Sequence, residues 1–173
     1  MQAMTLSARS QPTLSASFAT TAEEHLDDVY AYLVYLTRDR SLAEDLVADT
    51  FEKALRSWRR FDARRGSART WLCQIARTTA LDWFRAEERR RRREERAAAP
   101  EHVDASFAEG LSPDLEGALA ALSAGEREVI ALRILLELDG DEAARVLGIS
   151  PTAVSTRLSR ALKKLEEKVS IHV

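Results

Sequence analysis

The sequence has 173 residues, a formal net charge of −2 and a hydrophobic share of 45%, with 31% charged residues but only six Gly and four Pro. This balance allows buried cores and favours helices over a loop-rich or all-β protein. No stretch approaches the roughly 20 apolar residues of a membrane helix, and residues 1–21 lack the apolar core of a signal peptide, so we exclude the membrane and secreted classes and expect a cytoplasmic protein without membrane insertion.

The few cysteine and histidine residues do not form the pattern of a metal site or a catalytic site. Cys73 is the only cysteine and has no His within ligand spacing, so we expect neither a disulfide nor a bound metal. His25, His102 and His172 are scattered, and there is no Gly-rich phosphate loop or acid–base pair at usable spacing. We therefore expect a protein that is not an enzyme and has no cofactor.

Charge is distributed in four alternating blocks. Residues 22–55 contain nine acidic and three basic side chains, whereas residues 56–96 contain fourteen Arg and six acidic side chains. Residues 97–139 have nine acidic against two basic side chains, and residues 150–168 have five basic against two acidic ones. Separate surfaces for a polyanion and for a protein partner would give this pattern, although solvated helix faces also contain charge runs.

The first half predicts three helices. Residues 1–21 lack periodicity and are expected to be a disordered tail. Apolar residues then recur at helical spacing over 26–33 and 42–58, which predicts two consecutive helices. The Arg-rich segment 58–70 interrupts this pattern, which resumes over 71–83 as a third helix.

The second half begins with a strong helix signal. Ser123 precedes Glu126 at the spacing of a capping box, and Asp139 stands three residues before Glu142 in the same way. Gly148 is expected to end the helix that follows Asp139, and a last helix is expected to begin at Ser150 and Pro151.

These elements predict an all-α protein of two small helical domains joined by a flexible linker, with a helix-turn-helix in the second domain. The expected boundaries are a disordered N-terminal tail over 1–21, a first domain over 22–96, a linker over 97–117 and a second domain over 118–173.

The helix-turn-helix is predicted over residues 141–165. A small Ala144 allows two helices to cross closely, Gly148 lies in the turn, and Val154 faces inward. Hydroxyl, guanidinium and ammonium groups occupy the outer face of the second helix, and these groups suit base edges and phosphates of DNA. An ordinary helical hairpin with a solvated basic face is the alternative. The candidate DNA-binding residues are Thr152, Ser155, Thr156, Arg157, Arg160, Lys163 and Lys164.

The second half resembles region 4 of sigma factors, but residues 122–129 (LSAGEREV) are also similar to the start of LuxR-type DNA-binding domains. The first half separates the two families, because residues 43–55 (AEDLVADTFEKAL) resemble sigma region 2.2 and residues 71–77 (WLCQIAR) resemble the start of the promoter-reading helix of region 2. With only regions 2 and 4, the sequence is identified as a member of the extracytoplasmic-function (ECF) group of bacterial sigma factors. A stand-alone LuxR-type regulator is the alternative.

The resemblance implies a sigma factor that binds core RNA polymerase, directs promoter-specific initiation and is held inactive by an anti-sigma factor. It implies that the polymerase binds an acidic stripe formed by Asp45, Asp49 and Glu52, which recur at helical spacing. It also implies that cationic and polar groups hold the downstream promoter element as a single strand. The residues implied for this role are Arg64, Arg65, Ser67, Arg69, Arg77 and Arg85.

Some positions carry separate expectations. Trp71 and Trp83 fall on the apolar stripe and are interpreted as core residues, whereas Phe61 is more open to stacking on a base. Thr78 stands where many members of the family have Asn, so a base contact made by that Asn is not expected to carry over unchanged. The Arg-rich run 89–96 either supports the linker or is a solvated helix end.

Overall fold

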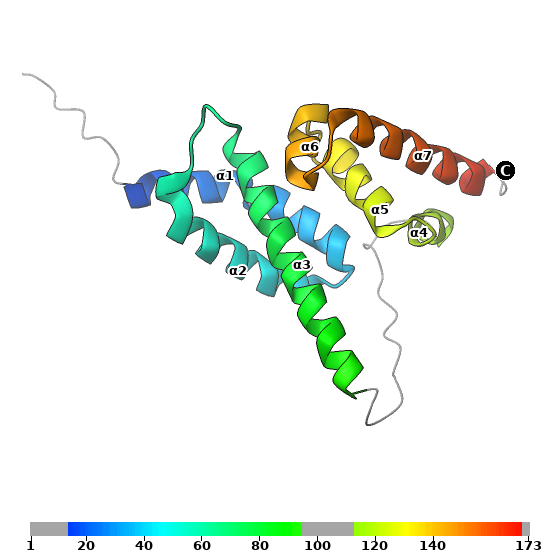
Figure 1. The fold of residues 1–173 in the computed structure, drawn as a ribbon, viewed down its shortest axis with the longest axis horizontal. Helices are drawn as coiled ribbons and strands as arrows, with labels where there is room; N and C mark the ends of the chain where they lie inside the picture. The colour runs from blue at the N-terminus through cyan, green and yellow to red at the C-terminus, as the bar shows by residue number, and fades with distance from the viewer. Residues whose placement is uncertain (1–13, 95–112, 171–173) are drawn as a thin grey trace, which may run out of the picture.

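The computed structural model describes residues 14–94 and 113–170 (Figure 1). Within these ranges the chain is helical apart from short turns and loops, and it contains no strand. The prediction of an all-α protein is therefore confirmed. None of the described helices is long and apolar enough to cross a membrane. Residues 1–13, 95–112 and 171–173, which include most of the expected tail and linker, lie outside the described residues.

The first half is a unit of three helices. A tight turn joins α1 (Leu14–Thr37) to α2 (Arg40–Ser57), with Arg38 at a φ of 58° and Asp39 accepting a hydrogen bond from the Leu42 amide (3.0 Å). A short 3-10 turn, η1 (Trp58–Arg60), and a loop lead to α3 (Ala68–Glu94). The three helices pack on one another. Fully buried side chains of this unit include Val29, Leu33, Ala43, Ala54, Leu72, Cys73 and Ala76.

The first helix begins earlier than the sequence indicates. We expected an unstructured tail as far as residue 21, but α1 starts at Leu14. The physical reason is Phe18, which is only 7% exposed and packs edge-on against Trp58 (5.4 Å between ring centroids) and Phe51 (6.5 Å). The packing of Phe18 against aromatic residues of the first domain therefore stabilises the first turns of α1, where apolar residues do not recur at helical spacing.

The third helix is longer than expected at its C-terminal end. The pattern over 71–83 predicts its apolar part, but α3 continues through the Arg-rich run as far as Glu94. Exposed ion pairs at helical spacing, such as Arg90 with Glu87 (2.6 Å) and Arg92 with Glu88 (2.7 Å), line this extension. The described part of the run is therefore a solvated helix end.

The second half contains α4 (Pro113–Ala120), α5 (Ala124–Ile130), a π-helical turn η2 (Ala131–Leu135), α6 (Gly140–Leu147) and α7 (Pro151–Ser170). Capping boxes are present at Ser123–Glu126 and at Asp139–Glu142, as predicted. Helix α4 packs against α7 and starts at Pro113, so the last residues of the range expected as linker, 97–117, are helical instead. Its apolar residues Leu115 and Leu119 join a cluster with Leu122, Ile130 and Ala161.

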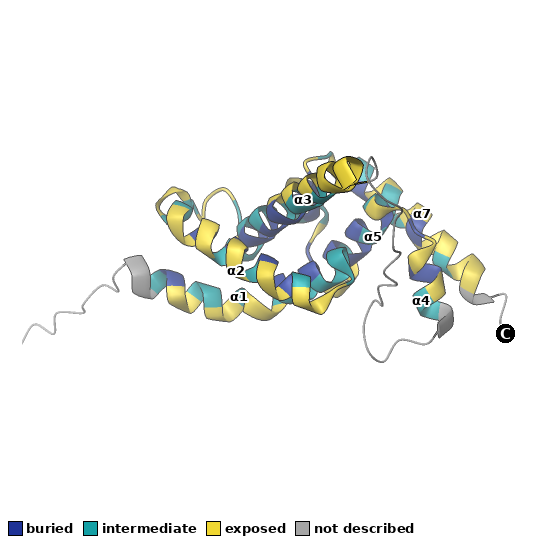
Figure 2. Cartoon of the chain, turned by 90° about the horizontal axis from the view of Figure 1, so that it is seen from below, coloured by how far each residue is buried: buried dark blue, intermediate teal, exposed yellow. Residues whose placement is uncertain are grey.

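The two halves lie against each other in this structure. Helix α3 packs on α6, and α1 packs on α5 and η2. Buried residues from both halves form one continuous apolar cluster, which includes Leu33 and Leu72 from the first half and Leu132 and Val154 from the second. In Figure 2 the ribbon of α3 and of α5 is coloured as buried over the stretches where the two halves meet.

Candidate nucleic-acid interface

The helix-turn-helix has the predicted form. Helix α6 ends at Gly148, whose φ of 67° is the left-handed conformation that glycine adopts without strain. The Ile149 amide then donates to the Ala144 carbonyl (3.2 Å), and the Ala153 amide donates to the Ser150 hydroxyl (3.1 Å) as α7 begins. Ala144 is 6% exposed and Val154 is fully buried, so the two helices meet at the positions that the sequence indicates.

The outer face of α7 is polar and accessible. Six of the seven candidate residues on it are exposed, and Arg157 is half-buried. The hydroxyls of Ser155 and Thr156 donate to the carbonyls of Pro151 (3.2 Å) and Thr152 (2.9 Å), one turn earlier in the helix. Their oxygen atoms still have acceptor capacity toward an outside donor.

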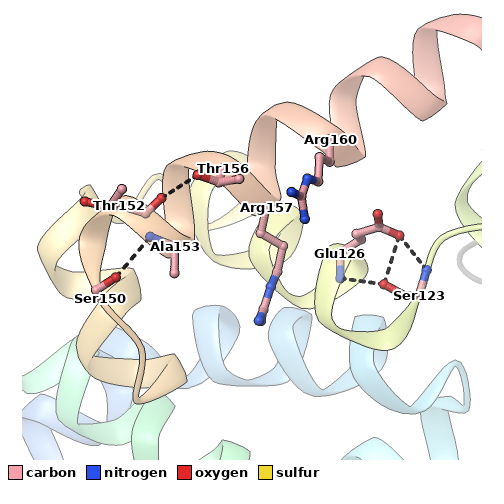
Figure 3. A pocket seen from close by; sticks show the side chains of 8 residues that line it. All are labelled: Ser123, Glu126, Ser150, Thr152, Ala153, Thr156, Arg157 and Arg160. Carbon is pink, nitrogen blue, oxygen red and sulfur yellow. Dashed lines mark hydrogen bonds between the residues drawn. The ribbon is translucent and has the colours of Figure 1, made fainter.

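An open hollow of about 490 Å³ lies between this face and the start of α5 (Figure 3). Arg157 and Arg160 project into it from α7, on the side of Ser123 and Glu126. Neither arginine forms an ion pair with a carboxylate of the described residues. The hollow therefore presents two cations beside hydroxyl groups, which is an arrangement suited to a phosphate backbone. Its lining is Ser123, Glu126, Ser150, Thr152, Ala153, Thr156, Arg157 and Arg160.

Both candidate lysines lie beside acids of the same half. Lys164 Nζ lies 2.7 Å from Glu126 Oε1, and Lys163 Nζ lies 4.0 Å from Glu167 Oε1. The Lys164 ammonium and the Ser123 amide lower the pKa of Glu126 to about 2, because both donate hydrogen bonds to the ionised carboxylate. Lys164 therefore fixes α7 to the start of α5 in addition to being available at the surface.

The loop before α3 forms a second, smaller hollow of about 120 Å³. Arg64 and Arg65 are exposed in this loop, and Arg64 makes a two-point hydrogen bond to Asp62 (3.0 Å for each) that lowers the pKa of Asp62. Arg65 forms no ion pair with the carboxylates of the described chain. The hollow is lined by Arg60, Phe61, Asp62, Arg65, Gly66, Ser67 and Trp71.

The aromatic residues of this loop pack together. Phe61 stacks on Trp58 (5.0 Å between centroids, 9° between planes) and touches Trp71 at 5.3 Å. Phe61 is therefore part of an aromatic cluster and not a separate platform, while its half-buried ring still lines the hollow. Trp71 and Trp83 are also half-buried and pack against the core, in line with their interpretation as core residues.

The remaining candidates, on α3 or directly before it, have partners within the described protein. Arg69 pairs with Asp28 of α1 (3.6 Å), and Arg85 pairs with Asp82 (3.3 Å) at an exposed position. Arg77 binds Glu128 of α5 (2.7 Å), and Ser67 donates to Glu142 of α6 (3.0 Å). Thr78 is exposed and donates to the Gln74 carbonyl (2.9 Å).

The acidic stripe lies on the outer face of α2. Asp45, Asp49 and Glu52 are exposed, while Leu46 and Thr50 on the opposite face are buried. Glu52 is paired with Arg56 in the same helix, and Asp45 and Asp49 form no ion pair within the described residues. The stripe thus supports no buried contact and remains available to a basic partner.

Sequence reasoning missed the residues that join the two halves. Glu128 is 7% exposed and binds both Tyr32 and Arg77, and Glu142 binds Ser67 and Thr70. A signal was available for Glu128, because a charged residue directly before the buried run Val129–Leu132 is rarely buried without a partner. Among the described residues no cluster of His, Cys, Asp or Glu could hold a metal ion.

Comparison with known proteins identifies these two halves. The chain matches Sigma-70 region 2 over residues 21–90 and Sigma-70, region 4 over residues 113–165. It is 38% identical over 138 residues to the ECF RNA polymerase sigma factor SigC of Mycobacterium tuberculosis, covering 78% of this chain and 73% of SigC. It is 28% identical over 168 residues to the ECF RNA polymerase sigma factor SigX of Bacillus subtilis, covering 91% of this chain and 86% of SigX.

A solved structure extends the match to the arrangement of the halves. The sigma factor RpoE of Bartonella quintana, in complex with the anti-sigma factor NepR, aligns with a TM-score of 0.75 and 26% identity over 90% of this chain and 98% of RpoE. The chain therefore belongs to the ECF RNA polymerase sigma factors, which are transcription initiation factors. The alternative of a stand-alone LuxR-type regulator is not favoured.

Proposed function

We propose that the two domains of this sigma factor, region 2 over 22–96 and region 4 over 118–173, have different binding roles. The first binds core RNA polymerase through the acidic stripe and holds the downstream promoter element at the loop before α3. The second binds the upstream promoter element through α7. The main support is the separation of charge on the molecule: exposed acids lie on α2, whereas Arg157 and Arg160, two cations that form no ion pair within the described residues, lie on α7.

The hollow between α7 and α5 supports a DNA-binding role for α7. Arg157 can present two donors to a guanine edge, which is the commonest specific contact in the major groove. Arg160 and Lys163, farther along the exposed face, suit phosphates. The hydroxyls of Thr152 and Thr156 line the same hollow and complete a surface that suits both bases and backbone.

The loop before α3 supports the second DNA-binding role. Arg65 offers a cation with no carboxylate partner in the described residues, beside the half-buried rings of Phe61 and Trp71. A cation next to an aromatic wall suits an unstacked base and its phosphate. We propose that this hollow receives one base of the downstream element.

We further propose that an anti-sigma factor in the cytoplasm controls this chain by engaging both domains at once. The fold matches a sigma factor that was solved in complex with an anti-sigma factor. Each domain offers a modest contact area, and engaging two linked areas raises the overall affinity through effective concentration. Recovery of a stoichiometric protein that blocks polymerase binding, in a pull-down from native cells, would support this regulation, and full-length chain found only free or polymerase-bound would contradict it.

The central experiment is transcription in vitro with purified core RNA polymerase and a promoter library. The unaltered chain should direct initiation from a defined set of promoters. Reversing the charge of Asp45, Asp49 and Glu52 together should abolish polymerase binding while leaving helicity unchanged, because these side chains are exposed.

The matched control reverses three exposed acids of α1, Glu23, Glu24 and Asp27, and should leave polymerase binding intact. Equal losses in the two triple variants would show that net charge matters and not the stripe. Tight promoter binding by the chain alone, with no effect of polymerase, would favour a stand-alone regulator.

A further inference from the structure

The C-terminal end of α3 extends beyond the packed part of the first half. Trp83 and Phe84 are the last residues of this helix that pack against the core. Residues 85–94, which we call the stem, contain no large apolar side chain, and all of residues 88–94 are exposed. Figure 1 shows this end of α3 running past the other helices of the first half. Core packing therefore does not account for the stem.

The acids of the stem are all paired with arginines of the stem. These ion pairs join Arg90 and Arg91 to Glu87 (2.6 and 3.6 Å), Arg90 to Glu94 (3.1 Å), and Arg92 to Glu88 (2.7 Å). Glu87 and Glu94 are seven residues apart, so they lie on the same side of the helix. The negative charge of the stem is therefore concentrated where it neutralises Arg90 and its neighbours.

Arg85, Arg89 and Arg93 form a row on another side of the stem, at steps of four residues. With about 3.6 residues per turn, this row faces away from Glu87. Arg89 and Arg93 form no ion pair with any carboxylate that the structure describes. Arg93 Nε donates to the Arg89 carbonyl (3.2 Å), which leaves the other N–H groups of its guanidinium for an outside acceptor.

This order of charges is unfavourable for a helix that meets only water. Like charges four residues apart destabilise a helix, and the row contains two such pairs, Arg85 with Arg89 and Arg89 with Arg93. A polyanion placed along the row would relieve this repulsion, because each of its charges would lie beside a cation. The row is therefore a candidate binding surface for a polyanion.

The row continues a face of α3 that begins at the hollow of the loop before the helix. Trp71 lines that hollow, and Thr78 and Arg85 follow it at steps of seven residues, which is about two helical turns. Because α3 is one unbroken helix, a rise of about 1.5 Å per residue places Arg89 about 27 Å and Arg93 about 33 Å along the axis from Trp71. This is the length of about eight to ten base pairs of duplex DNA.

We propose that Arg85, Arg89 and Arg93 bind phosphates of the double-stranded DNA between the two promoter elements, without reading its sequence. This inference rests on the proposed function, in which the loop before α3 and helix α7 bind two elements of one DNA molecule. The chain continues from the stem to the second domain, so the stem leads from the downstream element toward the upstream one. The row has no aromatic side chain on which an unstacked base could lie, so it suits the backbone of paired DNA.

The test compares two double variants of the full chain that have the same net charge. Arg89→Gln with Arg93→Gln removes two cations of the row, whereas Arg90→Gln with Arg91→Gln removes two arginines that are paired with Glu87. Glutamine and arginine have similar helix propensities, so circular dichroism should show the same helicity in both variants. The probe is a fluorescent mixed-sequence DNA duplex, whose binding is measured by anisotropy at several salt concentrations.

The row variant should bind the duplex more weakly at low salt and with a smaller salt dependence. Each phosphate contact contributes about 0.9 to the slope of log K against log salt, so the loss of two contacts should lower this slope by about 1.8. Between about 50 and 200 mM salt, the affinity of the row variant should therefore fall about tenfold less than that of the parent. The paired variant should retain the parent slope. Arg89→Lys with Arg93→Lys keeps both charges and should retain it as well.

A second measurement locates the contact on the DNA. It uses the chain bound to core RNA polymerase and a promoter selected by transcription in vitro. Replacing the spacer phosphates nearest the downstream element by uncharged methylphosphonates should weaken binding of the parent and of the paired variant. The same replacement should cost the row variant nothing further, because its contact is already lost. Losses that add in the row variant would overturn the proposed position of the row.

Three results with the mixed-sequence duplex would overturn the proposal. Equal losses in the two double variants would mean that only net charge matters, and an unchanged row variant would mean that the row remains solvated. Tighter binding of a single strand than of the duplex, with the loss confined to the row variant, would assign the row to opened DNA. Failure of the unaltered chain to direct transcription from any promoter concerns the proposed function instead, because the mixed-sequence duplex reports on the row without promoter recognition.

Discussion

The guanidinium of Arg157 lies directly over Gly125. A β-carbon at Gly125 would stand 3.1 Å from Arg157 Nη1, which is closer than ordinary van der Waals contact, and 3.4 Å from Arg157 Cζ. The absence of a side chain at the start of α5 therefore gives Arg157 its position in the hollow between α5 and α7. Gly125, in the first turn of α5, therefore affects the position of Arg157, which is proposed to contact DNA.

Gly125→Ala should weaken recognition of the upstream promoter element without lowering the stability of the fold. Alanine favours a helix over glycine by roughly 0.5 to 1 kcal/mol, so the free energy of unfolding should be unchanged or slightly higher. The Arg157 guanidinium would have to move, and preference at the upstream element should weaken. Gly140→Ala is the control, because a β-carbon at Gly140 meets nothing within 4 Å. Identical promoter preferences in these two variants, measured by binding to randomised upstream elements, would contradict the role given to Gly125.

The two kinds of contact proposed on α7 predict different losses. Arg157→Ala should relax base preference at the upstream element at a cost of about 1 to 3 kcal/mol, whereas Lys163→Ala should weaken binding to all sequences alike and flatten its salt dependence. The half-buried position of Arg157 and the exposed position of Lys163 fit this division. Binding titrations of both variants at several salt concentrations measure it, and equal effects on preference would overturn it.

Promoter opening should depend on the loop before α3. Neutralising Arg65 and Arg69 together should leave polymerase binding intact but reduce strand separation, because both would meet the exposed strand after opening begins. Arg65→Gln alone is the cleaner variant, because Arg69 also pairs with Asp28 of α1. Arg64→Gln is a useful comparison, since Arg64 is already bonded to Asp62. Permanganate footprinting of thymines near the start site gives the measurement, and normal reactivity in Arg65→Gln would count against the assignment.

Features that depend on residues close together in the sequence could be predicted from it. The capping box at Ser123–Glu126 and the turn at Gly148 depend on residues within a few positions, so the sequence alone locates them. The buried carboxylate of Glu128 depends instead on Tyr32, 96 positions away, and on Arg77, 51 positions away. No pattern along one helix contains that information, so the covering of α3 was not foreseen.

The same reasoning explains the tail and the linker. Phe18 is an isolated aromatic residue among Ser, Thr and Ala, and only its contact with Trp58 shows that α1 begins before it. Residues 113–117 contain Pro and Gly, which suggest a linker, but Leu115 packs into the second core. The acidic stripe and the exposed face of α7 were predicted more fully, since exposure on a helix follows from the buried positions beside it.

Acid should weaken the second half through Glu126. Its pKa is about 2 in the folded chain against an ordinary value of 4.5, so the folded state favours the ionised form. The resulting stabilisation is fully present above about pH 4.5 and is lost as the pH falls toward 2, because the unfolded chain takes up the proton first. Glu126→Gln should therefore reduce the decline of the urea midpoint over this window. An unchanged pH profile in the variant would show that the pair with Lys164 contributes nothing to folding.

The last prediction concerns the contact that lengthens α1. Phe18→Ala should lower the free energy of unfolding by about 3 kcal/mol, the lower part of the range for a buried phenylalanine, because Phe18 lies near one end of the core. The fluorescence of Trp58, whose ring centroid is 5.4 Å from that of Phe18, should change in the folded state as well. Glu23→Ala, an exposed change in the same helix, should stay within about 0.5 kcal/mol of the parent. Urea unfolding of the two variants measures the difference, and equal midpoints would mean that residues 14–21 add nothing to the stability of the first domain.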